Sequence, residues 1–159
     1  MSILNKDPVK RVEKFLKEYD SNLKVTLLDN SARTALEAAA SLNCKVGAIV
    51  KSLLFRAKNT FILCLVAGDK KASLIKIKKI INVKDVSMAS AEEVKNVTGF
   101  TIGGVSPVGH LNKIDIYIDN SLERFDNLYA AAGHPNCVFK VDYSNLQKMT
   151  KGLIKEISE

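Results

Sequence analysis

Two strongly apolar runs, residues 48–56 and 60–66, lie next to each other near the middle of the chain. Both have the length and the content of β-branched and aromatic residues that predict a strand. Only a short polar segment around Lys58 and Asn59 separates them, so we expect a β-hairpin. An antiparallel strand pair is therefore part of any fold that this chain adopts.

Other predicted elements flank the hairpin without a strand-helix-strand rhythm. Residues 73–81 fit both periodicities, and we favour a helix because Leu74, Ile77 and Ile81 share a helical face. Helices are also predicted at residues 8–19, 31–42 with Ser31 as the N-cap, 90–99 with a Ser90/Glu93 capping box, and 144–150. Strands are predicted at residues 24–28, 114–118, 128–132 and 137–141. This pattern predicts one α+β domain built around a strongly curved mixed sheet.

The size and composition of the chain agree with a single domain over residues 1–159. With 159 residues and 47% hydrophobic content, it can bury roughly two-thirds of its unfolded surface. The longest apolar run, residues 61–67, is far shorter than the roughly 20 residues of a membrane span, and the N-terminal residues lack a signal-peptide core. We therefore expect a soluble cytoplasmic protein.

Cysteine and histidine are too few and too scattered to predict a metal centre. The three cysteines, Cys44, Cys64 and Cys137, have no C-x-x-C spacing and lie in apolar or mixed segments, which favours reduced, buried thiols. His110 and His134 are the only histidines. A zinc site is not expected, and no cofactor is predicted.

Positive charge is concentrated in one part of the chain. The net charge is +7, and residues 70–84 contain six lysines and no acidic residue. These lysines are Lys70, Lys71, Lys76, Lys78, Lys79 and Lys84. Such a stretch suits a polyanionic partner, and a solvated helix face is the alternative.

Residues 103–110 combine three glycines with Pro107, which suits a loop that turns backbone N–H groups toward a ligand. The segment is not a Walker loop, because Val105 and His110 stand where lysine would be required. It is not a nucleophile elbow, because Val108 stands in place of glycine, nor does its glycine spacing fit a dinucleotide fingerprint. A ligand-binding loop and a plain surface turn both remain open.

Lys51 lies in the interior of the first hairpin strand. Alternation places it on one face with Ile49, Leu53 and Phe55, while Val50, Ser52 and Leu54 share the other face. An ammonium in this position either reaches water, protects an exposed strand edge, or points into a cavity that holds an anionic or carbonyl oxygen. The residues alone do not decide between these roles.

Three segments together resemble the YbaK and prolyl-tRNA synthetase-associated editing family. They are Val50-Lys51-Ser52-Leu53, the G-x-x-x-P loop from Gly103 to Pro107, and Ala132-Gly133-His134-Pro135-Asn136. The resemblance implies a mixed sheet that closes toward a barrel with helices outside, and a metal-independent hydrolase that deacylates mischarged aminoacyl-tRNA. The chain looks like a free-standing member.

The resemblance also implies a set of site residues and a substrate. Lys51 would contact the 3′ end of the tRNA or the scissile ester. Gly103, Gly104, Val105, Ser106 and Pro107 would present backbone groups to the aminoacyl moiety, and Gly133 and His134 would help to bind it. The G-H-P variant suggests removal of alanine or another small residue from tRNA(Pro). Lys70, Lys71, Lys76, Lys78 and Lys79 would hold the acceptor stem. Prolyl-tRNA synthetase as a second partner is left open.

Two other functions are considered. The fold could serve as a non-catalytic module that binds tRNA or docks on a synthetase. An esterase with Ser106 as the nucleophile is disfavoured, because Pro107 lacks the N–H that an oxyanion hole would take from the residue after the serine.

Overall fold

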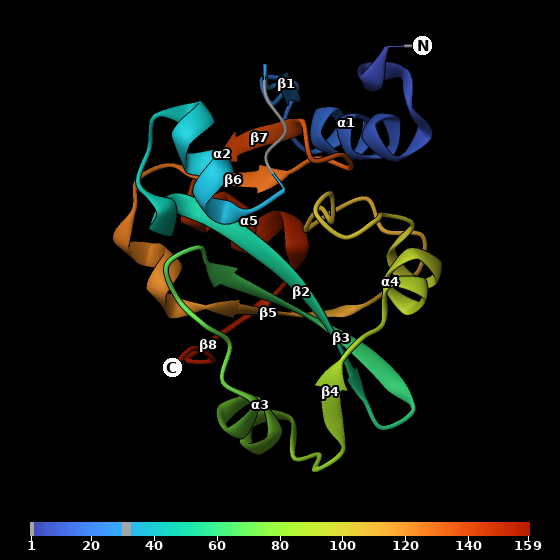
Figure 1. Cartoon of the computed structure of the whole chain (residues 1–159), viewed down its shortest axis with the longest axis vertical. Coiled ribbons are helices and arrows are strands. Elements are labelled where there is room, and N and C mark those ends of the chain that lie inside the picture. The colour runs from blue at the N-terminus through green and yellow to red at the C-terminus, as the bar shows by residue number, and fades with distance from the viewer. Residues whose placement is uncertain (1, 30–32) are drawn as a thin grey trace.

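The predicted hairpin lies at the centre of the computed structural model, which describes residues 2–29 and 33–159. Strand β2 (Ile49–Ala57) pairs antiparallel with β3 (Thr60–Ala67) from Val50 to Ala57. Lys58 in the turn has a φ of 60°, in the left-handed region that tight turns use. Figure 1 shows the two strands crossing the middle of the molecule as a long twisted ribbon.

The remaining strands extend this hairpin into one mixed, curled sheet. The sheet order is β1-β7-β6-β2-β3-β5-β8, and β4 pairs with the far end of β2. The added strands are β1 (Thr26–Leu27), β4 (Val86–Met88), β5 (Asp115–Asp119), β6 (Leu128–Ala131), β7 (Cys137–Val141) and β8 (Leu153–Lys155). The β2–β6, β3–β5 and β5–β8 pairs are parallel. The mixed, curved sheet is as predicted, although β1 and β8 end the order and do not close it into a barrel.

Five α-helices of the described residues accompany the sheet. They are α1 (Asp7–Tyr19), α2 (Ala35–Leu42), α3 (Leu74–Ile81), α4 (Ala91–Thr98) and α5 (Tyr143–Thr150). The preference for a helix over residues 73–81 is confirmed, with Ser73 as its N-cap, and so is the Ser90/Glu93 capping box of α4. The predicted cap Ser31 lies outside the described residues. Helix α2 is capped by Thr34 in a capping box with Glu37.

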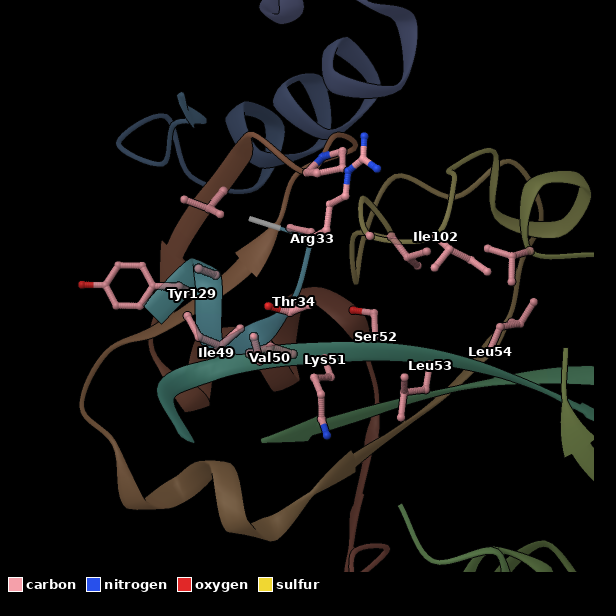
Figure 2. Close-up of a pocket in the computed structure, with 18 of the residues that line it drawn as sticks. Arg33, Thr34, Ile49, Val50, Lys51, Ser52, Leu53, Leu54, Ile102 and Tyr129 are labelled. Carbon is pink, nitrogen blue, oxygen red and sulfur yellow. The ribbon is translucent and has the colours of Figure 1, made fainter. Parts of the chain in front are cut away.

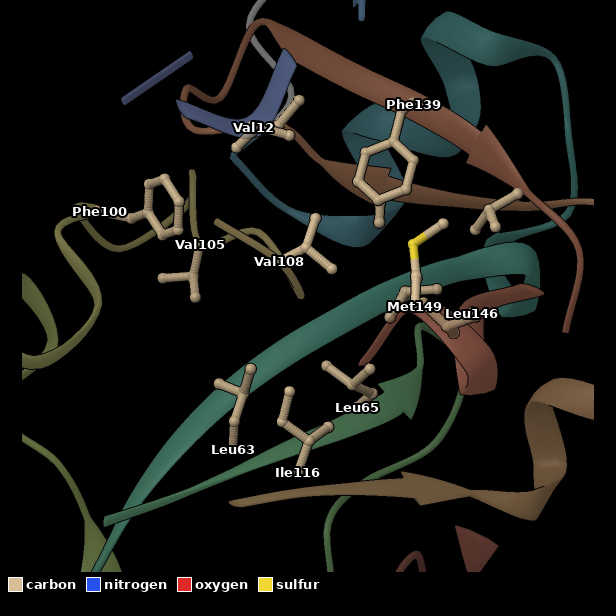
Figure 3. Close-up of a cluster of buried hydrophobic side chains, with 14 of the residues drawn as sticks. Val12, Leu63, Leu65, Phe100, Val105, Val108, Ile116, Phe139, Leu146 and Met149 are labelled. Carbon is tan, nitrogen blue, oxygen red and sulfur yellow. The ribbon is translucent and has the colours of Figure 1, made fainter. Parts of the chain in front are cut away.

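The curl of the sheet separates two of the three apolar clusters found among the described residues. The larger core lies inside the curl, where Val12 of α1, Leu63 and Leu65 of β3, and Phe139 of β7 converge (Figure 3). The smaller core lies on the outer face, where Phe55, Ile62 and Cys64 pack against Ile77 of α3. Alternation along β2 therefore sends Val50 and Leu54 inward and Leu53 and Phe55 outward, as the period of two predicts.

The cysteines are free thiols; Cys64 and Cys137 are buried, as expected, and Cys44 is half-buried. Among the described residues, no helix has both the length and the apolar character needed to cross a bilayer.

Candidate functional site

A cavity of about 380 Å³ lies between the inner side of β2 and the glycine-rich loop. Ser52 and Leu54 border it from β2, Gly103 and Val105 from the loop, and Arg33 and Pro135 also line it. Figure 2 shows Arg33, Thr34, Ser52 and Ile102 gathered above β2 around this space. The predicted hollow between strand and loop is therefore present, and its wall is mainly apolar.

The cavity meets β2 where that strand has a free edge. The parallel ladder with β6 stops at Val50, and the antiparallel ladder with β4 begins at Phe55. In the antiparallel pair with β3, Ser52 stands opposite Leu65 at a position whose N–H and C=O point away from β3. Leu54 points its carbonyl the same way and accepts from Ala89 N–H at 3.0 Å. The N–H and C=O of Ser52 are thus directed at the cavity edge with no partner in either ladder of the described residues.

Ser52 also contributes an unsatisfied hydroxyl. Its Oγ is buried, and no hydrogen-bond partner for it is found in the described part of the chain. An unpaired buried hydroxyl costs on the order of 1–3 kcal/mol, so a ligand that bonded to it would gain by doing so. Ser52 belongs to one of the segments that carry the family resemblance, but the sequence indicates no role for it. The feature that identifies Ser52 is its place between the β6 ladder and the β4 ladder on β2. This gap is seen only when the strand pairing is known.

The glycine loop is fixed against the turn between β6 and β7. A Cβ on Gly104 would lie 2.9 Å from the Cα and the N of His134, a contact that only glycine avoids. Gly133 N–H donates to the Gly104 carbonyl at 3.0 Å. Gly103 has a φ of 94°, which turns the chain toward the cavity. Of the predicted loop residues, Gly103 and Val105 line the cavity, and Gly104 holds them from behind.

Ser106 and Pro107 are buried behind the cavity wall. Ser106 Oγ accepts from Val108 N–H at 3.2 Å, and its carbonyl lies 2.7 Å from His110 Nε2, which must donate because a carbonyl only accepts. Neither residue lines the cavity. A direct contact of these two residues with the aminoacyl moiety does not fit this geometry, and an esterase centred on Ser106 does not fit it either.

The Lys51 side chain points away from the cavity. Its ammonium donates to the carbonyl of Lys70, and Figure 2 shows Lys51 and Ser52 on opposite sides of β2. Burial lowers the pKa of Lys51, while nearby Asp69 raises it. In this structure the ammonium therefore does not point into the cavity, whereas the resemblance implies that Lys51 contacts the 3′ end of the tRNA or the scissile ester. Alternation is the reason, because the cavity lies on the side of Val50, Ser52 and Leu54 and Lys51 faces the other way.

His134 lies behind the loop and does not line the cavity. Its Nδ1 accepts from Asn136 N–H at 3.0 Å, which orders the turn that carries Pro135 to the cavity. Burial lowers the pKa of His134, and the charges of Lys6 and Arg33 act in the same direction. Gly133 also lies behind the wall, where a Cβ would meet Pro8 O at 2.7 Å. Gly133 and His134 therefore lie behind the cavity wall and are not among its lining residues.

The lysine-rich stretch lies on the other side of the sheet. Helix α3 packs on the outer face of β2 and β3, and Figure 1 shows it on the far side of the hairpin from α2 and α4. Lys76 Nζ is engaged by Glu156 at 3.4 Å and by the Ser158 carbonyl at 2.7 Å. Arg33 also lines the cavity; it is exposed and was not singled out from the sequence.

Within residues 2–29 and 33–159, no three His, Cys, Asp or Glu side chains gather in a way that could hold a metal ion. The donors available at the cavity are hydroxyls, main-chain groups and the Arg33 guanidinium.

Comparison with known proteins gives consistent matches. Residues 29–149 match the family model of the aminoacyl-tRNA editing domain. The chain is 31% identical over 143 residues to the uncharacterized protein YwhH of Bacillus subtilis, covering 89% of this chain and 90% of that protein. It is 29% identical over 130 residues to the proline–tRNA ligase of Bacillus velezensis, covering 82% of this chain but only 22% of the ligase. The chain thus spans about a fifth of the ligase.

A solved structure extends the match to nearly the whole fold. A crystal structure of a proposed trans-editing enzyme for prolyl tRNA synthetase superimposes with a TM-score of 0.91 at 35% identity, covering 97% of this chain and 98% of the other. The match includes α1, which the family model leaves out.

Proposed function

Because the chain belongs to the aminoacyl-tRNA editing domain family, we propose that it is a deacylase that hydrolyses the ester of mischarged aminoacyl-tRNA. The finer proposal is that its substrate is tRNA(Pro) carrying alanine or another small amino acid. The observation that carries the proposal is the apolar cavity bordered by the free edge of β2 at Ser52 and by Gly103 of the loop.

The chemistry of the cavity suits an activated ester. The neighbouring ribose hydroxyl already activates the aminoacyl ester, so a site without a metal can act by positioning it and polarising its carbonyl. We propose that Ser52 N–H donates to the ester carbonyl and that Ser52 C=O accepts from the α-ammonium group. The apolar wall formed by Leu54 and Val105 would then face the amino-acid side chain.

Lys51 remains the proposed catalytic cation. Its main chain borders the cavity, and its four-carbon stem is flexible. Its ammonium would have to exchange the Lys70 carbonyl for the substrate ester or the terminal phosphate. In this proposal the observed contact belongs to the free protein, and binding of the tRNA 3′ end breaks it.

The tRNA body is proposed to follow the basic side of the molecule. Its 3′ end would enter past Arg33, and the acceptor stem would pass the turn at Lys70 and Lys71 toward Lys76, Lys78 and Lys79 of α3. The support for this path is charge, because phosphates attract lysines at any base sequence. Prolyl-tRNA synthetase is proposed as a second partner, on the likeness to its editing segment.

Such an enzyme is needed because the size of a binding pocket discriminates poorly against smaller amino acids. A synthetase pocket built for proline cannot exclude smaller amino acids by size, since one methylene is worth only about 1–3 kcal/mol. A second site that admits only the smaller residues then clears the error.

The test is release of labelled amino acid from alanyl-, cysteinyl-, seryl- and prolyl-tRNA(Pro) by purified protein. We expect fast release of alanine and retention of proline. If all four esters are protected and no amino acid is released, the protein is a module that only binds tRNA and not a deacylase. Release of cysteine or serine in preference to alanine would keep the deacylase and change its substrate.

A further inference from the structure

Helix α1 lies outside the residues matched by the editing-domain model, yet it forms part of the wall behind the cavity. Val9, Val12 and Leu16 of α1 are fully buried in the larger core. Figure 3 shows Val12 directed toward Phe100, Val105 and Val108 of the glycine-rich segment.

Arg11 joins the two ends of the segment 99–109, which contains the glycine loop. Its Nη2 donates to the Gly99 carbonyl at 2.9 Å, and its Nε donates to the Gly109 carbonyl at 3.2 Å. Its guanidinium also lies over the Phe100 ring, 5.0 Å from the centroid. Gly99 and Gly109 have φ values of 81° and 80°, so they are the bends at which the segment begins and ends. This half-buried side chain therefore bridges the two bends, beside the main-chain bond in which Leu111 N–H donates to the Thr98 carbonyl at 3.1 Å.

These contacts require arginine. The planar guanidinium presents donors in different directions and stacks on an aromatic ring, whereas an ammonium is a compact charge without that fork. Gly103 and Val105, which line the cavity, lie between the two bends. Any change in the separation of Gly99 and Gly109 moves this wall relative to Ser52 on β2.

We propose that Arg11 is a positioning residue for the deacylation reaction, acting through the glycine loop that it clamps; this rests on the proposed function. Preorganised geometry controls rate steeply, and a shift of about 1 Å can cost up to 100-fold. Loss of the clamp should therefore lower the rate at saturating substrate more than it weakens tRNA binding.

The test compares Arg11→Met and Arg11→Lys with Lys14→Met, an exposed residue of the same helix. For each protein, single-turnover deacylation is measured over a range of protein concentration, together with hydrogen exchange of the peptide covering residues 99–110 and the urea unfolding curve. We expect Arg11→Met to lower the saturating rate by about tenfold or more, to leave the half-saturating concentration within about twofold, and to speed exchange in this peptide. Arg11→Lys should fall between Arg11→Met and the wild type, and Lys14→Met should match the wild type.

The outcomes separate the two proposals. A folded Arg11→Met protein with the wild-type rate and unchanged exchange overturns the clamp. If Arg11→Met does not fold, the same readouts on Arg11→Lys decide the question. If the wild-type protein releases no amino acid, the deacylase proposal fails, and faster exchange confined to residues 99–110 in Arg11→Lys still decides whether Arg11 orders the loop. A general increase in exchange over the whole chain would count against a positioning role.

Discussion

The ammonium of Lys51 is bonded to the main-chain carbonyl of Lys70, behind the strand whose free edge borders the cavity. Substrate binding must therefore compete with this contact if Lys51 acts on the ester. Since burial lowers the pKa of Lys51, the contact also compensates part of the cost of holding a charge there.

Replacement of Lys51 by alanine should lower single-turnover deacylation by about 100-fold, the loss expected when a group that stabilises developing charge is removed. It should also lower the free energy of unfolding by roughly 1–2 kcal/mol, because the Lys70 carbonyl loses its donor. The matched control is Lys140→Ala, an exposed lysine of strand β7 outside the proposed site, which should retain the wild-type rate. Full turnover by folded Lys51→Ala protein would remove Lys51 from the mechanism.

Gly104→Ala should disrupt the support of the loop. The added Cβ would lie 2.9 Å from main-chain atoms of His134, which cannot move aside without shifting the β6–β7 turn. We expect the free energy of unfolding to fall by about 1–3 kcal/mol and the deacylation rate of the folded protein to fall as well. Urea denaturation and single-turnover kinetics measure both. Thr101→Ala, an exposed change in the same loop, serves as the control, and equal effects of the two would argue against a specific contact.

Acid should destabilise the protein through its two half-buried histidines. Burial lowers the pKa of both His110 and His134 below the ordinary value of about 6.5. Between the folded and the unfolded pKa values, the unfolded chain binds more protons, so the free energy of unfolding decreases as pH falls below about 6.5. Unfolding curves at pH 7.5, 6.5 and 5.5 test this. His110→Gln, which retains a donor for the Ser106 carbonyl, should flatten the dependence, and an unchanged slope would exclude His110 as a source.

The lysines of α3 provide a separate test of the tRNA path. Neutralising Lys78 and Lys79 together with glutamine should weaken tRNA binding and reduce the dependence of log affinity on log salt by about 0.9 for each lost phosphate contact. Filter binding between low and moderate salt measures both quantities. The comparison is Glu92→Gln on the exposed side of α4, which removes a charge of opposite sign. If the double substitution leaves affinity and salt slope unchanged, the acceptor stem does not follow α3.

Local sequence patterns predicted the elements that carry their own signal. The hairpin has two apolar runs around a polar turn, and α4 has a capping box at Ser90 and Glu93. Strands β4 and β8 were missed because each has only three residues, and their extended form depends on pairing with distant β2 and β5. A sequence pattern of three residues does not indicate which distant strand the segment will pair with.

The site could be predicted only in part, because some of its features have a local sequence signal and others depend on contacts between distant segments. Glycines and Pro107 marked residues 103–110 as a loop of interest, and Gly103 and Val105 do line the cavity. Alternation along β2 correctly grouped Val50, Ser52 and Leu54 on one face. Which face meets the loop depends on how the sheet curls, and this is set by contacts between distant segments. The direction of Lys51 and the free edge at Ser52 were therefore beyond the reach of sequence patterns.

Filling the cavity tests most directly whether the site between β2 and the loop performs the hydrolysis. Ala131, half-buried on β6, lines the cavity, whereas Ala40 is exposed on α2 and adds the same bulk to solvent when replaced. The measurement is release of labelled alanine from alanyl-tRNA(Pro) at saturating protein by Ala131→Phe, Ala40→Phe and wild-type protein, with tRNA binding measured in parallel. We predict that Ala131→Phe loses release but keeps tRNA binding, while Ala40→Phe keeps both. Release at the wild-type rate by a folded Ala131→Phe protein would contradict the account.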